Sequence, residues 1–128
     1  MADAAVGQKI LVVDDSSTSR LMIKTRLARS GYQILEAASG AEAVQMARAH
    51  QPSLLLLDYF LPDMTGAQVL TQLKADAATQ RVPVIVLSGN DSEEDVRSCE
   101  SLGAAGFLLK PYEPEDLLQK VSDALAAG

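Results

Sequence analysis

The chain has 128 residues, of which 48% are hydrophobic and 22% charged, a composition typical of one soluble globular domain. Because 17 acidic residues outnumber 11 basic ones, the net charge of −6 argues against direct binding to nucleic acid. The one cysteine excludes an internal disulfide, and no apolar stretch approaches the roughly 20 residues that span a bilayer. We therefore expect a cytoplasmic protein without membrane contact. A single domain is expected over residues 1–128, with residues 1–8 as a flexible N-terminal tail.

Short apolar runs mark the expected strands. Three of them are apolar without alternation, which is typical of strands buried on both faces of a parallel sheet. The runs are Lys9–Val13, Gln33–Ala37, Ser53–Leu57, Pro83–Leu87 and Gly106–Leu109. Segments of roughly 10–15 residues follow each run, and their apolar residues recur with the helical spacing of about 3.6. The pattern predicts an α/β protein of the (βα)5 type, a doubly wound open parallel sheet.

The ends of the expected helices carry residues that favour capping. Ser39–Glu42 and Thr65–Gln68 have the spacing of capping boxes, in which two backbone N–H groups are satisfied reciprocally. Gly31 and Gly103 follow expected helices, where a left-handed backbone conformation is wanted. These signals predict where the helices begin and end. The sequence contains no internal repeat and no internal linker.

Polar side chains follow four of the five expected strands. Asp14 and Asp15 follow the first, Asp58 the third, Ser88 the fourth and Lys110 the fifth. Taken singly, each is ordinary, because an aspartate is favoured at a helix N-cap and a lysine is usually solvated. Ligands of open α/β sheets bind beyond the carboxyl ends of the strands, so the coincidence at these positions indicates a functional site.

The charges of these side chains predict the chemistry. Two carboxylates about 4 Å apart repel each other by about 4 kcal/mol at an effective dielectric constant of about 20, so three carboxylates need a compensating cation. A hard divalent ion such as Mg²⁺ suits oxygen ligands. Lys110 supplies a second positive charge, and Ser88 a hydroxyl donor. The set predicts a phosphoryl-transfer site in which Asp58 is the nucleophile and forms an aspartyl phosphate.

Four motifs carry a resemblance to a known family. They are LVVDDSSTSR, LLLLDYFLPDMTG, PVIVLSGND and GAAGFLLKPYEPEDL, and their order and spacing from about Lys9 to Ala126 resemble the receiver domains of bacterial two-component response regulators. The resemblance implies a flavodoxin-like sheet with the strand order 2-1-3-4-5. It also implies a phosphoacceptor signalling domain, and not an enzyme acting on external substrates.

The resemblance implies a metal site with four members. Asp15 would bind Mg²⁺ directly, Asp14 mostly through water, Asp58 through one oxygen, and Phe60 through its backbone carbonyl. Mn²⁺ is expected to substitute for Mg²⁺.

The resemblance further assigns the phosphoryl-binding and switch residues. Ser88 and Lys110 would bind the phosphoryl group, and the peptide bond before Pro111 would be cis. Phe107 would be the switch aromatic that moves inward as Ser88 is drawn toward the phosphate. An aromatic residue on a short last strand is also typical of a core, so both interpretations of Phe107 stay open.

Two further positions are expected to tune the lifetime of the phosphorylated state. Phe60 lies two residues beyond Asp58, and Asn90 lies two residues beyond Ser88. Both would lie near the path of the hydrolytic water, and the bulky, apolar Phe60 is expected to hinder it.

The resemblance also implies partners. The phosphodonor would be a phosphohistidine on a sensor histidine kinase or a histidine phosphotransfer protein. The output to an unknown effector would come from the face made by the fourth helix, the fifth strand and the fifth helix, in a monomer or a weak phosphorylation-dependent dimer. Two alternatives stay open, a receiver-like interaction module that is not phosphorylated and a phosphohydrolase with an aspartyl nucleophile. The sequence does not decide between a stand-alone regulator and a receiver from a larger protein.

Overall fold

One parallel sheet forms the centre of the molecule. The computed structural model describes residues 8–89 and 93–127, so all but Gln8 of the expected N-terminal tail lies outside the described residues. Its five strands lie in the order β2-β1-β3-β4-β5, and the predicted fold and strand order are confirmed. The elements, in chain order, are β1 (Lys9–Val13), α1 (Ser17–Arg29), β2 (Gln33–Ala37), α2 (Gly40–His50), β3 (Leu54–Asp58), α3 (Gly66–Lys74), β4 (Val84–Ser88), α4 (Glu93–Ser101), β5 (Gly106–Leu109) and α5 (Pro114–Ala127).

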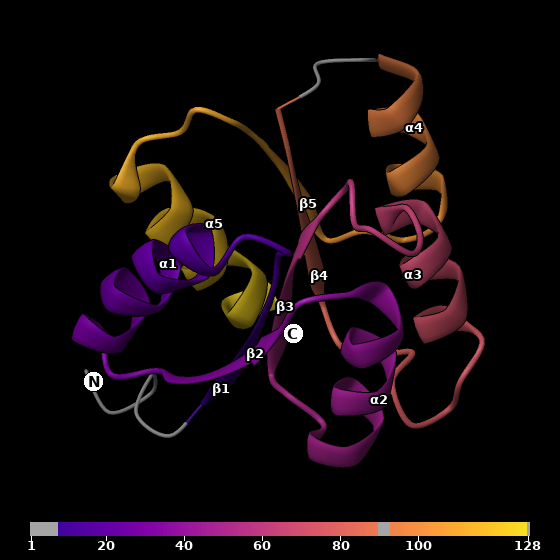
Figure 1. The fold of residues 1–128 in the computed structure, drawn as a ribbon, viewed down its shortest axis with the longest axis horizontal. Helices are drawn as coiled ribbons and strands as arrows, with labels where there is room; N and C mark the ends of the chain where they lie inside the picture. The colour runs from indigo at the N-terminus through magenta and orange to yellow at the C-terminus, as the bar shows by residue number, and fades with distance from the viewer. Residues whose placement is uncertain (1–7, 90–92, 128) are drawn as a thin grey trace.

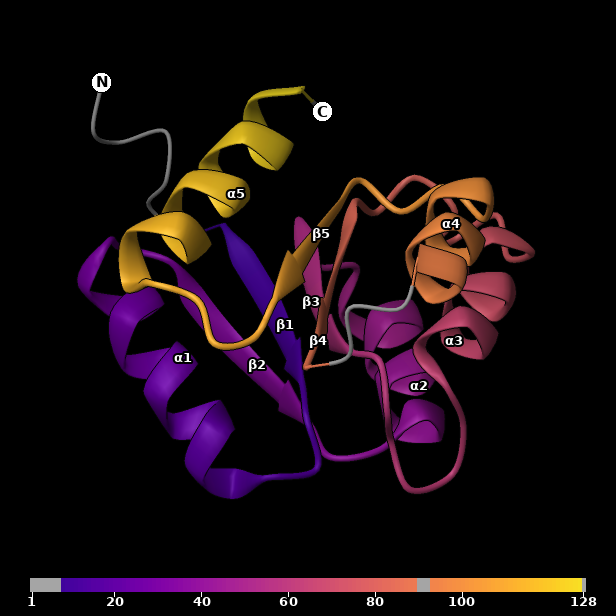
Figure 2. The same cartoon turned by 90° about the horizontal axis from the view of Figure 1, so that it is seen from above.

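The helices cover the sheet on both faces. Helices α1 and α5 lie on one face, and α2, α3 and α4 lie on the other (Figure 1). The view from above shows the same two layers, with the strands between them (Figure 2). Alternate residues of β3 divide between the faces, because Leu54 and Leu56 join the core cluster with α1 and α5, whereas Leu55 and Leu57 join the other cluster. Both faces of β3 are therefore buried, which explains its unbroken apolar sequence.

Strands β3 and β4 each begin and end one residue later than the apolar runs predict. Asp58 is still paired with Leu87 in the ladder, and Ser88 is paired with Leu109. The predicted bounds were wrong by one residue because an apolar run marks burial, whereas backbone pairing continues into the polar residue that follows. Asp58 and Ser88 are consequently held by the sheet itself and not by a loop.

The predicted caps form in part as expected. Thr65 and Gln68 make a complete capping box at the start of α3. At the start of α2, the side chain of the N-cap residue Ser39 accepts a hydrogen bond from the Glu42 N–H, as expected. The return bond differs from a capping box, because Glu42 Oε1 accepts from the N–H of Ala38, at 2.6 Å, and not from that of Ser39. Gly31 and Gly103 have φ values of 93° and 92°, the left-handed conformation predicted for them.

Helix α2 has a second cap, which comes from a distant loop. Asp63 follows β3, and its Oδ1 and Oδ2 accept hydrogen bonds of 2.8 and 2.9 Å from the N–H groups of Gly40 and Ala41. These bonds from the α2 backbone hold the pKa of Asp63 below its usual value of 3.8. The carboxylate thus ties the β3–α3 loop to the first turn of α2.

Replacement of Asp63 by asparagine is expected to destabilise the protein in a pH-dependent manner. A carboxyl group whose pKa is lower in the folded state contributes stability above its unfolded pKa, and that stability is lost as the pH falls through the folded value. Asp63→Asn should therefore lower the urea midpoint at neutral pH, and the difference from wild type should shrink below pH 3.8. Asp123→Asn is the control, because Asp123 is exposed and bonds with Gln119 on its own helix. A deficit that is equal at every pH would contradict this explanation.

Candidate functional site

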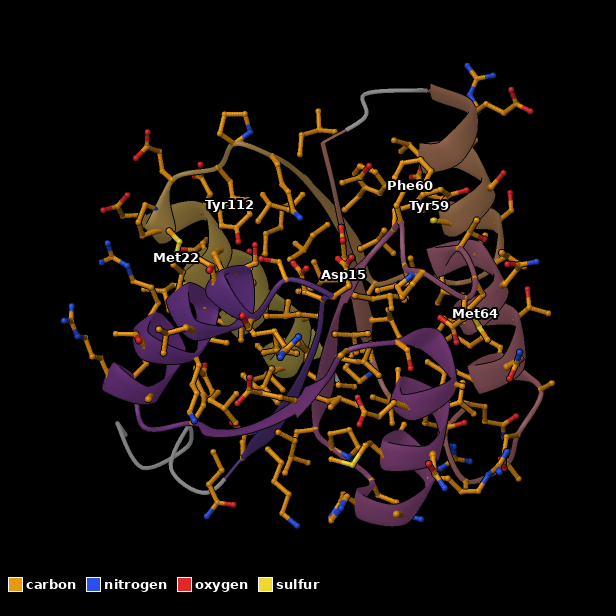
Figure 3. All side chains as sticks on the ribbon, in the orientation of Figure 1. Asp15, Met22, Tyr59, Phe60, Met64 and Tyr112 are labelled. Atoms are coloured by element: carbon orange, nitrogen blue, oxygen red, sulfur yellow. The ribbon has the colours of Figure 1, made fainter. Side chains whose placement is uncertain are left out.

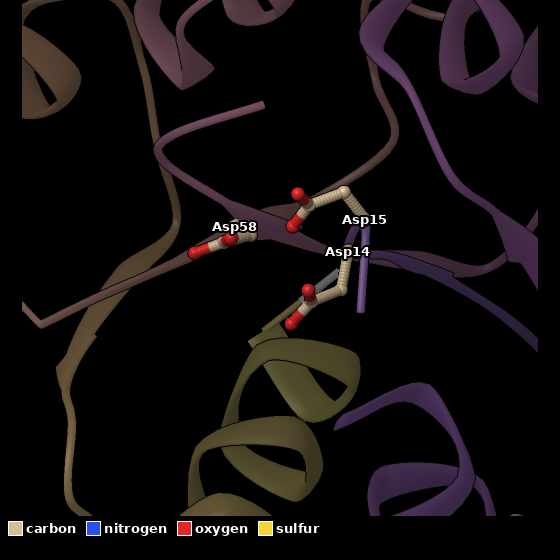
Figure 4. Close-up of side chains that lie close together, drawn as sticks. All are labelled: Asp14, Asp15 and Asp58. Atoms are coloured by element: carbon tan, nitrogen blue, oxygen red, sulfur yellow. The ribbon is translucent and has the colours of Figure 1, made fainter. Parts of the chain in front are cut away.

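Three aspartates converge at the carboxyl edge of the sheet. Asp14 and Asp15 come directly after β1, Asp58 ends the neighbouring strand β3, and the view of all side chains shows Asp15 at this edge (Figure 3). One carboxylate oxygen from each aspartate lies within 4.8 Å of the other two. The close-up shows the three carboxylates grouped around one small region (Figure 4). The structure thus brings together the three acidic side chains of the predicted metal site.

Asp14 is the most deeply buried of the three aspartates. The residue is 2% exposed, and its Oδ1 accepts a hydrogen bond of 2.9 Å from the Ser16 N–H. Its Oδ2 is buried and has no hydrogen-bond partner among the described residues. A buried carboxylate oxygen without a donor carries an uncompensated desolvation cost, which a bound cation or its water would remove.

Lys110 brings a positive charge to the same edge from the end of β5. Its Nζ lies 3.2 Å from Asp58 Oδ1, to which it donates a hydrogen bond, and 3.6 Å from Asp14 Oδ2. Burial alone would lower the pKa of Lys110, but the attraction of Asp58 and Asp14 outweighs it, and the net pKa is raised. The peptide bond between Lys110 and Pro111 is cis, the geometry that the resemblance implied. Lys110 therefore lies as a cation between two of the three carboxylates.

The charge of Asp58 is under-compensated by the protein alone. Its side chain is 13% exposed. Burial raises the pKa of Asp58, Lys110 lowers it, and the neighbouring charges of Asp14 and Asp15 raise it again, so that the net pKa lies above the usual value. One lysine does not neutralise three carboxylates. Their oxygen ligands, and the Asp14 Oδ2 that accepts no hydrogen bond among the described residues, fit a hard divalent cation, which favours such ligands.

The other predicted site residues lie on or after the neighbouring strands. Ser88 is fully buried at the end of β4, and its carbonyl oxygen accepts a hydrogen bond of 2.8 Å from the Lys110 N–H. Phe60 lies two residues after the end of β3 with 55% of its surface exposed, and its ring meets the ring of Tyr59 edge to face, with the ring centroids 4.9 Å apart. Phe107 is half-buried and packs against the core cluster on the face of α2, α3 and α4. Asn90 lies outside the described residues.

One contact at the site has no counterpart in the sequence-based interpretation. Arg20 projects from α1, and its Nη1 donates a hydrogen bond of 2.6 Å to the backbone carbonyl of Asp14. Its Nε donates to Glu36 Oε1 at 3.0 Å. Arg20 belongs to the motif that carries the resemblance, but no local pattern reveals a contact with a strand end and an acid 16 residues away.

An apolar groove opens beside Lys110. It has a volume of about 280 Å³ and runs between α1 and the segment that joins β5 to α5. Met22, Tyr112 and Leu117 line it, and Asp14 lies at its inner end. Met22 is 66% exposed, and the neighbouring Leu21 is 61% exposed.

In the described parts of the chain, no helix is long and apolar enough to cross a bilayer.

Comparison with known proteins identifies the family. The family model of the response regulator receiver domain matches residues 10–122 of the chain. The chain is 36% identical to the protein PilH of Pseudomonas aeruginosa over 118 residues, which cover 92% of this chain and 98% of PilH. It is 30% identical to the structure of the chemotaxis protein CheY4 of Vibrio cholerae, with a TM-score of 0.87, and the match covers 93% of this chain and 99% of that one.

A further structure of similar fold contains a metal ion. It is the receiver domain of the sensor histidine kinase PA1611 from Pseudomonas aeruginosa, with a magnesium ion coordinated in its active-site cleft. The identity is 28%, the TM-score is 0.86, and the match covers 94% of this chain and 99% of that one. With a family match over most of its length, and with the acidic cluster and Lys110 at the expected edge of the sheet, this chain belongs to the receiver domains of two-component response regulators.

Proposed function

We propose that the chain accepts a phosphoryl group on Asp58 from a phosphohistidine, with Mg²⁺ held by Asp14, Asp15, Asp58 and the backbone carbonyl of Phe60. The convergence of three carboxylates within 4.8 Å beside Lys110 carries the proposal. The magnesium ion in the cleft of the PA1611 receiver supports the choice of metal. Bound Mg²⁺ supplies positive charge that offsets the carboxylates and the phosphoryl oxygens, and Mn²⁺ substitutes because it shares the same oxygen ligands.

Each residue of the site has a part in the transfer. A carboxylate oxygen of Asp58 attacks the phosphorus, the bond between phosphorus and the histidine nitrogen breaks, and the imidazole leaves with the electron pair. Lys110 then exchanges its ion pair with Asp58 for one with a phosphoryl oxygen. The Ser88 hydroxyl donates to a second phosphoryl oxygen. The domain acts only on itself, in acquiring and in losing the phosphoryl group.

The donor docks beside the site. A sensor histidine kinase or a histidine phosphotransfer protein must bring an imidazole to Asp58 and cover the groove next to Lys110. The exposed Met22 and the apolar walls of the groove support this surface as the docking site.

The output comes from α4, β5 and α5. A phosphoryl group adds roughly −1.5 to −2 charges at the end of β3. Ser88 and Phe107 form the switch, since movement of Ser88 toward the phosphoryl group makes room for the half-buried Phe107 to move inward. The altered face binds an effector protein in the cytoplasm, without direct contact with nucleic acid or membrane. The domain acts as a monomer or as a weak dimer that forms on phosphorylation.

One experiment separates this function from its two alternatives. The protein is incubated with Mg²⁺ and acetyl phosphate, and the adduct is followed by intact mass spectrometry, with EDTA as the blank. One stable phosphoryl group per chain is expected. Absence of any adduct would favour an unphosphorylated interaction module, and sustained turnover of many phosphate esters would favour a phosphohydrolase.

Replacement of Phe60 by asparagine is expected to shorten the phosphorylated lifetime severalfold. The exposed ring lies two residues after the acceptor and shields it from an in-line water, whereas asparagine both removes bulk and binds water. The measurement is loss of the adduct after removal of acetyl phosphate. Phe60→Leu keeps an apolar side chain and is expected to keep most of the wild-type lifetime. Equal decay of wild type and Phe60→Asn would remove the support for shielding.

A further inference from the structure

Arg20 joins three elements at the back of the acidic cluster. It lies one turn into α1, and its side chain is 17% exposed. Its guanidinium donates to the Asp14 carbonyl at the end of β1 and to the Glu36 carboxylate on β2, at 2.6 and 3.0 Å. Because the guanidinium group is planar and its donors are fixed in direction, two bonds from one group also fix the orientation of what they bind.

The backbone that Arg20 binds leads directly to Asp15. The Asp14 carbonyl belongs to the planar peptide unit that joins Asp14 to Asp15, so its direction sets the position of the next Cα. The other side of Asp14 is also held, because its N–H donates to the Ala37 carbonyl at 3.1 Å. The Asp15 side chain, in contrast, is exposed, so packing does little to orient it. The direction in which its Cα–Cβ bond leaves the backbone depends on the peptide unit that Arg20 holds.

The charge of Arg20 is balanced where it lies. Glu36 pairs with Arg20 at 3.0 Å and with Lys24 at 3.6 Å. If Arg20 acted on a bound cation through charge alone, it would repel that cation, and its removal would strengthen cation binding. If Arg20 acts by orienting the peptide unit, its removal weakens cation binding. The two effects have opposite signs, which makes them separable.

We infer that Arg20, held in place by Glu36, is a positioning residue for the magnesium site: by binding the Asp14 carbonyl it aims the Asp15 carboxylate at the metal. The inference rests on the magnesium site of the proposed function and adds Arg20 and Glu36 to it. Residues that orient metal ligands in this way typically change metal affinity by about 10–100-fold when they are replaced.

The test is a titration of the unphosphorylated protein with Mg²⁺, in which NMR follows the backbone amide signals at the strand ends. Arg20→Gln is expected to raise the magnesium dissociation constant about tenfold, the low end of the usual range. Arg20→Lys keeps the positive charge but loses the planar guanidinium that donates to two acceptors at once, so an intermediate loss of magnesium affinity is expected. Lys24→Gln is the matched control. It removes the same charge from the same helix. Because the Lys24 side chain is 49% exposed and its ion pair with Glu36 is weak in solvent, the magnesium dissociation constant should stay within about twofold of wild type.

A second measurement separates positioning from general damage. The magnesium concentration that gives half the maximal rate of phosphorylation by acetyl phosphate should rise with the dissociation constant in Arg20→Gln. The rate at saturating Mg²⁺ should approach that of wild type. Urea unfolding in EDTA establishes that each variant is folded, and Arg20→Lys decides the matter if Arg20→Gln does not fold.

The outcomes that overturn the inference are distinct from those that overturn the proposed function. Wild-type protein that shows no saturable binding of Mg²⁺ overturns the proposed function and the inference together. Wild type that binds Mg²⁺, with Arg20→Gln or Arg20→Lys binding as tightly or more tightly, overturns the inference alone.

Discussion

Asp58→Asn is expected to abolish phosphorylation by acetyl phosphate in the presence of Mg²⁺. The amide of asparagine is a poor nucleophile and carries no negative charge for Lys110, which lies 3.2 Å from Asp58 Oδ1, or for a metal ion. The shape of the side chain is kept, and Asp58 remains paired with Leu87 in the sheet. Intact mass spectrometry should show one phosphoryl group on wild type and none on the variant.

A control on the same protein distinguishes loss of the acceptor from loss of an acid. Asp123→Asn makes the same chemical change on the exposed side of α5, where Asp123 accepts a hydrogen bond of 2.9 Å from Gln119. It should be phosphorylated like wild type. A phosphoryl group found on Asp58→Asn, and mapped by peptide analysis to Asp14 or Asp15, would show that the wrong carboxylate has been assigned as acceptor.

Leu57→Ala is expected to lower the free energy of unfolding by about 2–5 kcal/mol. Leu57 precedes Asp58 in β3, is fully buried, and packs in the cluster that α2, α3 and α4 cover. Truncation loses the transfer free energy of the removed atoms and leaves a cavity that a close-packed interior fills incompletely. Urea unfolding followed by circular dichroism measures the difference.

The same substitution on the surface provides the comparison. Leu21 lies on α1 with 61% of its surface exposed, so Leu21→Ala should change the free energy of unfolding by no more than about 0.5 kcal/mol. Equal losses at the two positions would mean that the burial of β3 between two layers of helices does not account for its contribution to stability.

The fold was predictable from the sequence because strand burial and helix spacing leave local patterns. Lys9–Val13, Gln33–Ala37 and Gly106–Leu109 are strands with the predicted bounds. The bounds of β3 and β4 were each wrong by one residue, at Asp58 and Ser88. A polar side chain at the end of a strand looks like loop in the sequence, and only the neighbouring strand determines whether its backbone is paired.

The sequence predicts which side chains meet at this edge of the sheet, but not the contacts that support them. Asp14, Asp15, Asp58 and Lys110 meet at one edge because parallel strands place their carboxyl ends together. The contacts of Arg20 and Asp63 were not predictable in this way. Arg20 reaches Glu36 across 16 positions of the chain, and Asp63 caps a helix that begins 23 positions earlier. Such contacts depend on the distance between packed elements, which a local sequence pattern does not contain.

The segments on the two sides of Asp58 differ in how many contacts hold them. On one side, the loop after β3 is fastened by Asp63 to the start of α2, by the pairing of Phe60 with Thr65, and by the bond of 2.6 Å from the Gly66 N–H to the Tyr59 carbonyl. On the other side, β5 is the edge strand of the described sheet, where it pairs with β4. Displacing an edge strand disturbs one ladder of hydrogen bonds, whereas displacing an inner strand disturbs two. A displacement that begins at Asp58 is therefore expected to move β5 more readily than the loop after β3, because fewer backbone hydrogen bonds oppose it.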